Sequence, residues 1–276
     1  MTWALVRWRG RDEQRGRQTA AEFACPPGIC ESERVAHFYL NEELTEAAIG
    51  SRVQVTGPEA RHAVTVSRLK VGERVVIGNG SGLVVEGPIV SAEHTVLEIE
   101  VDTVTTEPPA SPAIWLTQAL AKGDRDEMAV QAATELGADG VIPWLAQRCI
   151  SRWDGAKVAK GHARWEAIVR EATKQSIRSW TPEVGAMVST KQLAALADST
   201  QMLVLDPEGD IALSAVETDG RDVVIVVGPE GGIAPAEFEM LEAAGATRVK
   251  LGSNVLRTST AGPAAIAVLS AKLGRW

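Results

Sequence analysis

No apolar run in this 276-residue chain is long enough to cross a membrane, and the first residues lack the apolar block of a secretory signal. These absences predict a soluble, cytoplasmic protein. Cysteine is scarce as well: the chain has three, and the pair that lies close together, Cys25 and Cys30, has no second ligand pair downstream. We therefore expect neither a metal site nor a disulfide framework.

Positive charge is in deficit overall, since the formal net charge is -8. Nucleic acid could therefore bind only through a local patch. Residues 147–178 form such a patch, with eight basic side chains against three acidic ones. Arg170, Lys174 and Arg178 follow one another at intervals of four, which places three like charges on one face of a predicted helix. This pattern fits a facing polyanion, but it also fits the solvated face of a long helix.

The pattern of apolar and polar residues along the chain predicts two folded regions after an N-terminal extension. Residues 1–34 lack apolar periodicity, and we expect them to be disordered. Residues 35–106 read as short alternating strands with one helix near residues 59–69, which is typical of a small β-barrel. The prolines of residues 107–112 predict a linker, because proline interrupts both helices and strand ladders.

Residues 113–276 alternate between buried strands and helices, which predicts an α/β domain with a parallel sheet covered on both faces. The predicted strands cover residues 113–120, 140–147, 202–207, 222–228 and 247–252, and the predicted helices cover 123–137, 158–178, 191–198, 235–245 and 260–273.

The segment "VVIVVGPEGGIAPAEF" places a glycine-rich corner, residues 228–232, between a buried strand and a helix. Ligands of parallel sheets bind beyond the carboxyl ends of the strands, and glycine lets the backbone approach them closely. The spacing matches neither a dinucleotide fingerprint nor a P-loop, and Glu230 would repel phosphate. The corner therefore predicts a ligand that is not a polyanion, unless it is an ordinary strand-to-helix turn.

The segment "LGSNVLRTSTAGPAA" predicts a second loop of the same kind, with Pro263 in the first turn of the following helix. Arg257 and three hydroxyl residues lie in this loop. Two such loops at neighbouring strand ends would form one pocket. Alternatively, Arg257 is an ordinary surface or capping arginine.

Together, "VGPEGG" and "LGSNVLRTSTA" resemble the paired signature of the SPOUT class of methyltransferases, and specifically the bacterial 16S rRNA (uracil-N3) methyltransferase family. The resemblance extends to "RHAVTVSRLKVGE", "GNGSG", "KGDRDEMAVQAATELGADGVIPWLAQRC" and "EATKQSIRSWTPEV", which appear in the same order. It covers the chain from Val35 onward. Residues 1–34 have no counterpart in the family pattern.

The resemblance implies a PUA-like β-barrel in front of a trefoil-knotted SPOUT domain, a homodimer, and S-adenosylmethionine as the cofactor. It implies methylation of N3 of a uridine in the 16S rRNA of the small ribosomal subunit. Carried over by position, the cofactor-binding residues are Leu205, Asp206, Val227, Gly228, Pro229, Glu230, Gly231, Gly232, Leu251, Gly252, Val255, Leu256, Arg257 and Thr258.

Two residues carry the expected chemistry. We expect Arg257 to stabilise negative charge on the uracil oxygens, while Glu230 or a water takes the N3 proton. Relatives often have glutamate where this chain has Ser259, which leaves Glu230 as the nearer acidic candidate. The residues expected to bind RNA are Arg61, His62, Arg68, Lys122, Arg125, Arg148, Arg152, Lys174 and Arg178.

Two alternative functions remain open. A ribose 2′-O-methyltransferase of the same superfamily is expected to carry an Asn-x-x-x-Arg element early in the catalytic domain, which "AIWLTQALAKGDRDEMA" lacks. A non-catalytic RNA-binding ribosome assembly factor would not need the intact "GPEGG" and Arg257.

Overall fold

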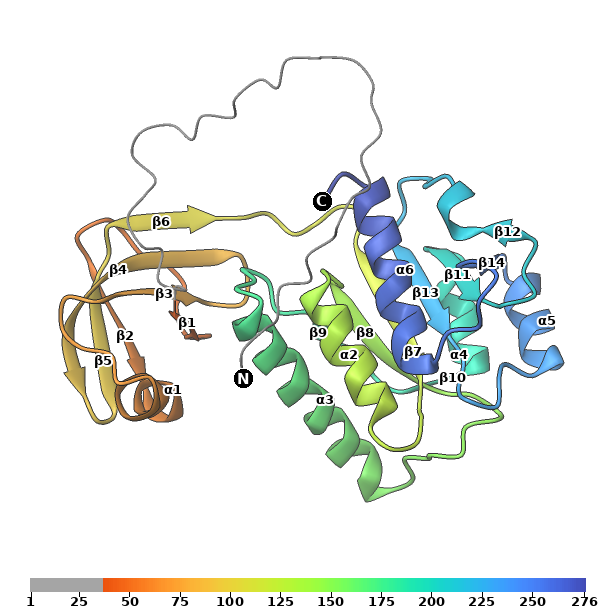
Figure 1. The fold of residues 1–276 in the computed structure, drawn as a ribbon, viewed down its shortest axis with the longest axis horizontal. Coiled ribbons are helices and arrows are strands. Elements are labelled where there is room, and N and C mark those ends of the chain that lie inside the picture. Colours follow the sequence, from red (N-terminus) through yellow and green to blue (C-terminus); the bar gives the residue numbers. More distant parts are fainter. Residues whose placement is uncertain (1–36) are drawn as a thin grey trace, which may run out of the picture. The chain divides into compact units, whose positions relative to one another are not determined.

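The computed structural model describes residues 37–276, so the predicted extension and its two cysteines lie outside the described part. Two sheets organise these residues (Figure 1). The first sheet belongs to the N-terminal domain and the second to the C-terminal domain. Residues 107–112, the predicted linker, connect them without forming a helix or strand.

The N-terminal domain is a six-stranded sheet with the order β1-β3-β4-β5-β2, in which β6 pairs with β4. Its edge strands are bridged by Asn41, whose Nδ2 donates to the carbonyl of Gln54 at 2.7 Å, so the sheet curls around one core. The strands are β1 (His37–Leu40), β2 (Arg52–Thr56), β3 (Arg74–Gly78), β4 (Leu83–Glu93), β5 (Val96–Glu100) and β6 (Thr103–Thr106).

The helix expected near residues 59–69 is present in two parts. Helix α1 (Gly57–Arg61) begins with Pro58 in its first turn and continues into a π-helical turn, His62–Val66. Ala60 and Ala63 are fully buried, while Arg61 and His62 are exposed. The segment therefore packs its small residues on the barrel core and presents its basic residues to solvent.

The C-terminal domain is the predicted parallel sheet, with the order β10-β8-β7-β13-β11-β14-β12 and with β9 paired to β8. All of its strand pairs are parallel, and every residue of β13 is buried, as expected for a strand covered on both faces. The strands are β7 (Ile114–Ala119), β8 (Gly140–Leu145), β9 (Glu183–Val184), β10 (Val188–Ser189), β11 (Gln201–Leu205), β12 (Ile211–Ala212), β13 (Val223–Val227) and β14 (Thr247–Lys250).

Three helices, α2 (Arg125–Glu135), α3 (Ala156–Gln175) and α6 (Thr258–Lys272), pack side by side through α2 and form one layer against the sheet (Figure 1). Helices α4 (Thr190–Leu196) and α5 (Pro235–Ala243) pack against each other, and a 3-10 turn covers Leu213–Ala215. In the described part of the chain, no helix is long and apolar enough to span a membrane.

Two details of the predicted helices are wrong. Helix α6 begins at Thr258, because the N–H groups of Thr260 and Ala261 already bond the carbonyl of Arg257, so Pro263 lies inside the helix rather than in its first turn. Helix α3 ends at Gln175, and Ile177 has a φ of 55°, so Arg178 lies beyond the helix.

Candidate functional site

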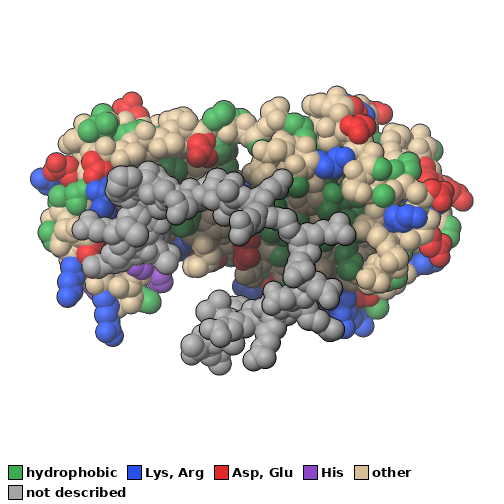
Figure 2. Space-filling model, turned by 45° about the horizontal axis from the view of Figure 1, so that its top comes forward, with side chains coloured by type: hydrophobic (Ala, Val, Ile, Leu, Met, Phe, Trp, Pro, Cys, Tyr) green, Lys and Arg blue, Asp and Glu red, His purple; other side chains and the backbone are tan. Residues whose placement is uncertain are grey.

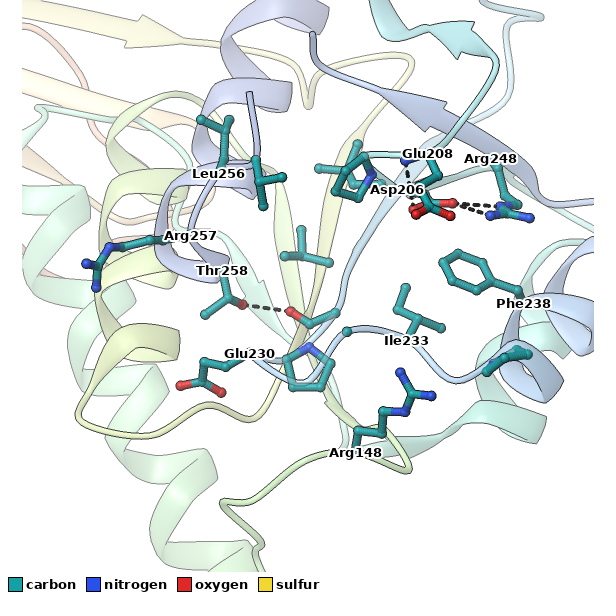
Figure 3. Close-up of a pocket in the computed structure, with 18 of the residues that line it drawn as sticks. Arg148, Asp206, Glu208, Glu230, Ile233, Phe238, Arg248, Leu256, Arg257 and Thr258 are labelled. Atoms are coloured by element: carbon teal, nitrogen blue, oxygen red, sulfur yellow. Dashed lines mark hydrogen bonds and ion pairs between the residues drawn. The ribbon is translucent and has the colours of Figure 1, made fainter. Parts of the chain in front are cut away.

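A pocket of about 690 Å³ opens where the neighbouring strands β11, β13 and β14 end (Figure 3). The loop that follows each strand contributes to its wall. It is lined by Arg125, Arg148, Leu205, Asp206, Pro207, Glu208, Val227, Gly228, Pro229, Glu230, Gly232, Ile233, Pro235, Phe238, Glu239, Glu242, Arg248, Val255, Leu256, Arg257 and Thr258.

The glycine corner after β13 is a tight turn that excludes side chains. A Cβ at Gly228 would lie 2.7 Å from Ile233 Cγ1, and Gly232 has a φ of +72°. Gly232 also donates its N–H to the carbonyl of Pro229 at 2.9 Å. The backbone itself therefore forms this wall of the pocket.

A largely buried chain of hydrogen bonds joins the ends of β7 and β13 to the start of α6. The Thr258 hydroxyl donates to the carbonyl of Gly228 at 2.8 Å and accepts from Nε2 of Gln118, which lies in β7, also at 2.8 Å. Gln118 is fully buried and Thr258 nearly so. This chain fixes the start of α6 against the corner, and it thereby fixes the backbone of Arg257 one residue before.

The Arg257 side chain is exposed and points away from the loops that surround it (Figure 3). Among the described residues, no hydrogen bond or ion pair engages its guanidinium. The backbone of Arg257 is therefore fixed, while the N–H donors of its guanidinium remain free for a ligand.

Glu230 lies on the same side of the pocket as Arg257 (Figure 3). Its carboxylate accepts from the backbone N–H of Lys122 at 3.0 Å and from Nη1 of Arg125 at 3.1 Å. Burial raises the pKa of Glu230, but the backbone N–H groups and Arg125 together outweigh it and lower that pKa below its usual value. Glu230 is thus a weaker proton acceptor than an unpaired glutamate, and its contacts tie the corner to the start of α2.

The opposite side of the pocket carries a different cluster, which we did not predict from the sequence. The Arg248 guanidinium lies 4.3 Å from the centre of the Phe238 ring and forms an ion pair with Asp206. Hydrogen bonding with Asp206 raises the pKa of Arg248. Glu242 approaches the same guanidinium at 3.8 Å. The charge of Arg248 is therefore balanced within the protein.

Eleven of the fourteen residues predicted to bind cofactor line the pocket; Gly231, Leu251 and Gly252 do not. The lining residues absent from that prediction are Arg125, Arg148, Pro207, Glu208, Ile233, Pro235, Phe238, Glu239, Glu242 and Arg248. Two of them, Arg125 and Arg148, were expected to bind RNA instead. Pro207 and Glu208 directly follow the predicted Leu205 and Asp206, so extending that loop would have found them.

The residues predicted to bind RNA fall into two groups. Arg61, His62, Arg68, Lys122, Arg148 and Arg152 are exposed, and Arg125 is half-buried. On the uncovered part of the face in Figure 2, basic side chains stand singly or in small groups among acidic ones. A continuous basic belt is not visible there.

Lys174 and Arg178 do not fit the expected contact with RNA phosphates. The Lys174 side chain is 10% exposed, and its ammonium pairs with Glu59 and Glu171, at 3.0 Å each. Arg178 donates to the carbonyls of Thr134 and Ala138 at 2.6 Å, and burial lowers its pKa.

The negative charge that faces Arg170 and Lys174 therefore comes from the protein itself. Arg170 pairs with Glu42 and lies 3.6 Å from Glu59, so carboxylates of the N-terminal domain face the like charges of α3. The sequence predicted either RNA or solvent opposite these basic residues, and it does not reveal that the chain itself supplies the negative charge.

Metal ligands are not gathered anywhere in residues 37–276: no group of three or more His, Cys, Asp or Glu side chains there could hold an ion. Cys149 is a buried free thiol. Burial raises its pKa to about 11.

Sequence comparisons identify the class of protein that this fold and pocket define. Residues 108–270 match the RNA methyltransferase domain family, and residues 55–101 match the RNA methyltransferase PUA domain. Ribosomal RNA small subunit methyltransferase E of Mycobacterium tuberculosis is 40% identical over 233 residues, which are 82% of this chain and 89% of that protein. The protein of the same name from Bacillus subtilis is 32% identical over 240 residues, 83% of this chain and 94% of that protein. The chain belongs to this family of RNA methyltransferases.

Solved structures agree with this assignment. Ribosomal RNA small subunit methyltransferase E from Neisseria gonorrhoeae, bound to S-adenosylmethionine, superposes with a TM-score of 0.77 at 28% identity, covering 86% of this chain and 98% of that one. A Legionella pneumophila protein in complex with the same cofactor gives a TM-score of 0.76 at 28% identity, with the same coverage of both chains. The α/β methyltransferase domain with a parallel sheet and the PUA-like domain, both expected from the sequence motifs, are confirmed, and the trefoil knot stays a prediction.

Proposed function

We propose that this protein transfers a methyl group from S-adenosylmethionine to N3 of a uridine in the 16S rRNA of the small ribosomal subunit. Family membership supports an RNA methyltransferase, and the names of its relatives support small-subunit rRNA as the substrate. The choice of uridine N3 rests on the motif resemblance. The observation that carries the proposal is the pocket that the three loops form at the ends of β11, β13 and β14.

The residues of this pocket fit S-adenosylmethionine. Its volume of about 690 Å³ falls in the usual range for small-molecule sites. Five carboxylates and four arginines line it, so its charges nearly balance, which suits a ligand with a sulfonium, an ammonium and a carboxylate but no phosphate. The corner at Gly228 leaves no room for a side chain, so its backbone can approach the ligand closely.

The sulfonium of the bound cofactor supplies an activated methyl group, so the protein mainly has to align it with the acceptor. N3 lies on the pairing edge of uracil, so the base must be unpaired or flipped out of its helix. As N3 loses its proton, negative charge spreads to the uracil oxygens, and we expect the unpaired guanidinium of Arg257 to stabilise it. The hydrogen bonds of Thr258 support this role, because they fix the backbone of the preceding Arg257.

We further propose that exposed basic residues hold the RNA backbone. Arg61, His62 and Arg68 are available on the PUA-like domain, and Lys122 and Arg152 lie on the methyltransferase domain. A homodimer and a cytoplasmic location complete the proposal, since the resemblance implies the first and a ribosomal substrate favours the second.

The test is methyl transfer from labelled S-adenosylmethionine to small ribosomal subunits from a strain lacking this protein, followed by mass mapping of the modified nucleoside. We expect a single 3-methyluridine in the small-subunit RNA. Methylation of a ribose would move the protein to the 2′-O class. If a folded protein bound RNA but transferred nothing, it would be an assembly factor and not an enzyme.

A further inference from the structure

Four arginines line the pocket, and two of them are neutralised by the protein. Arg125 pairs with Glu230, and Arg248 pairs with Asp206. Arg148 and Arg257 have no carboxylate partner among the described residues. Both guanidinium groups are therefore uncompensated, but that of Arg257 points away from the surrounding loops (Figure 3).

These two arginines reach the pocket from different elements. Arg257 precedes α6, whereas Arg148 lies in the loop after β8 and points into the pocket from below in Figure 3, away from Arg257. Nη1 of Arg148 donates to the carbonyl of Gly231 at 3.2 Å. A guanidinium has five N–H donors, so four remain after this bond.

Gly231 explains how Arg148 comes so close. A Cβ at this position would lie 3.2 Å from Cβ of Arg148 and 3.3 Å from its carbonyl oxygen. The glycine therefore lets the loop after β8 pack directly on the corner. There, the hydrogen bond from Arg148 to the carbonyl of Gly231 orients the Arg148 guanidinium. Gly231 does not itself line the pocket, so its place in the glycine-rich corner serves this packing.

S-adenosylmethionine has a single anionic group, the carboxylate of its methionyl part. A guanidinium without a protein carboxylate is the natural partner for it, because Arg and carboxylate form paired, charge-assisted hydrogen bonds. Arg257 is assigned to the reacting base. We propose that Arg148 binds the methionyl carboxylate of the cofactor, an inference that rests on the proposed cofactor and that replaces the expected contact of Arg148 with RNA.

Two ligands separate this role from others. S-adenosylhomocysteine keeps the carboxylate, and 5′-methylthioadenosine lacks the whole amino-acid part. By calorimetry, we expect Arg148→Gln to weaken binding of S-adenosylhomocysteine roughly 10- to 100-fold, the loss typical of a charged hydrogen bond. We expect binding of 5′-methylthioadenosine to change less than about twofold, because no interaction with it is lost. Unchanged binding of that ligand also shows that the variant is folded.

Arg152→Gln is the matched control, because Arg152 is exposed in the same segment but does not line the pocket. It should leave both ligands unaffected. Equal weakening of both ligands by Arg148→Gln would mean that Arg148 only shapes the corner, and would overturn the proposal. The proposal would also be overturned if Arg148→Gln left the binding of both ligands unchanged but reduced the salt dependence of RNA binding. Failure of the wild-type protein to bind either ligand would instead refute the proposed cofactor, and this inference with it.

Discussion

Arg257 is the one arginine lining the pocket whose guanidinium has no partner in the described part of the chain. Removing a donor that acts on charge formed in the transition state typically lowers turnover about 10²- to 10³-fold. We expect Arg257→Ala to lower the single-turnover rate of methyl transfer by this factor while binding of S-adenosylhomocysteine changes little. Arg257→Lys should retain part of the rate. A wild-type rate in the alanine variant would exclude this role.

The proton acceptor is a separate question, because the pairing of Glu230 lowers its pKa. An efficient general base has a pKa near the working pH, and this shift moves Glu230 further below it. We expect Glu230→Gln to keep the pH profile of kcat/KM, because a paired carboxylate is not the group that titrates in the reaction. Glu239→Gln is a control on the same pocket. If only Glu230→Gln moved the acidic limb of the profile, Glu230 would be the base after all.

Cys149 gives a test of burial that does not depend on activity. Because burial raises its pKa to about 11, almost none of the thiol is ionised at pH 8, and the thiolate is the reactive form. In a Cys25→Ser, Cys30→Ser variant, we expect iodoacetamide to label Cys149 only after unfolding by denaturant. Rapid labelling of the native protein, followed by mass spectrometry, would contradict this placement.

At the residue scale, the sequence predicted the pocket best where consecutive loop residues form its wall. The corner and the segment before α6 were found because glycines and polar residues interrupt apolar runs. Phe238 and Arg248 were missed because they come from α5 and β14, and only the packing of those elements brings them together. Lys174 and Arg178 were misread because sequence spacing shows like charges but not their partners.

At the scale of elements, the start of α6 depends on the hydroxyl of Thr258. Thr258→Val would leave the part-buried carbonyl of Gly228 and the buried Nε2 of Gln118 each without that hydrogen-bond partner. Such losses cost about 1–3 kcal/mol of unfolding free energy. We expect this decrease in urea unfolding, together with weaker binding of S-adenosylhomocysteine because the corner is released.

Thr258→Ser is the control for that experiment, since serine keeps the hydroxyl and should retain most of the stability and of the binding. If the valine variant were destabilised but bound the ligand normally, the hydrogen bonds would support the fold without positioning the pocket.

The longer elements were predictable because their patterns are strong. Continuous apolar runs indicated β7, β8, β11 and β13, and the helices between them were placed within a few residues. Strands β9, β10 and β12 were missed because each has only two residues, too few to show an alternation of apolar and polar side chains. The beginning of α6 was misplaced because Pro263 favours a first turn, whereas the backbone bonds to Arg257 start the helix earlier.

At the scale of the whole molecule, the basic helix α3 and the acidic residues of the N-terminal domain neutralise each other. Lys174 and Glu59 are both largely buried, and Arg170 also lies near Glu59. Breaking a buried pair destabilises a protein because it leaves a charge without its partner. The basic surface left for RNA is therefore smaller than the charge of residues 147–178 suggests.

This neutralisation predicts that two sets of basic residues behave oppositely. Lys174→Met should lower the free energy of unfolding by on the order of 2 kcal/mol, less than for a pair without other partners because Arg170 remains near Glu59. It should leave the salt dependence of RNA binding unchanged.

Arg61→Ala with Arg68→Ala should instead reduce the slope of log K against log salt by about two, since each lost phosphate contact removes about one. Stability should be unaffected, because both side chains are exposed. A reduced slope in Lys174→Met at wild-type stability would mean that the ammonium leaves Glu59 to contact RNA.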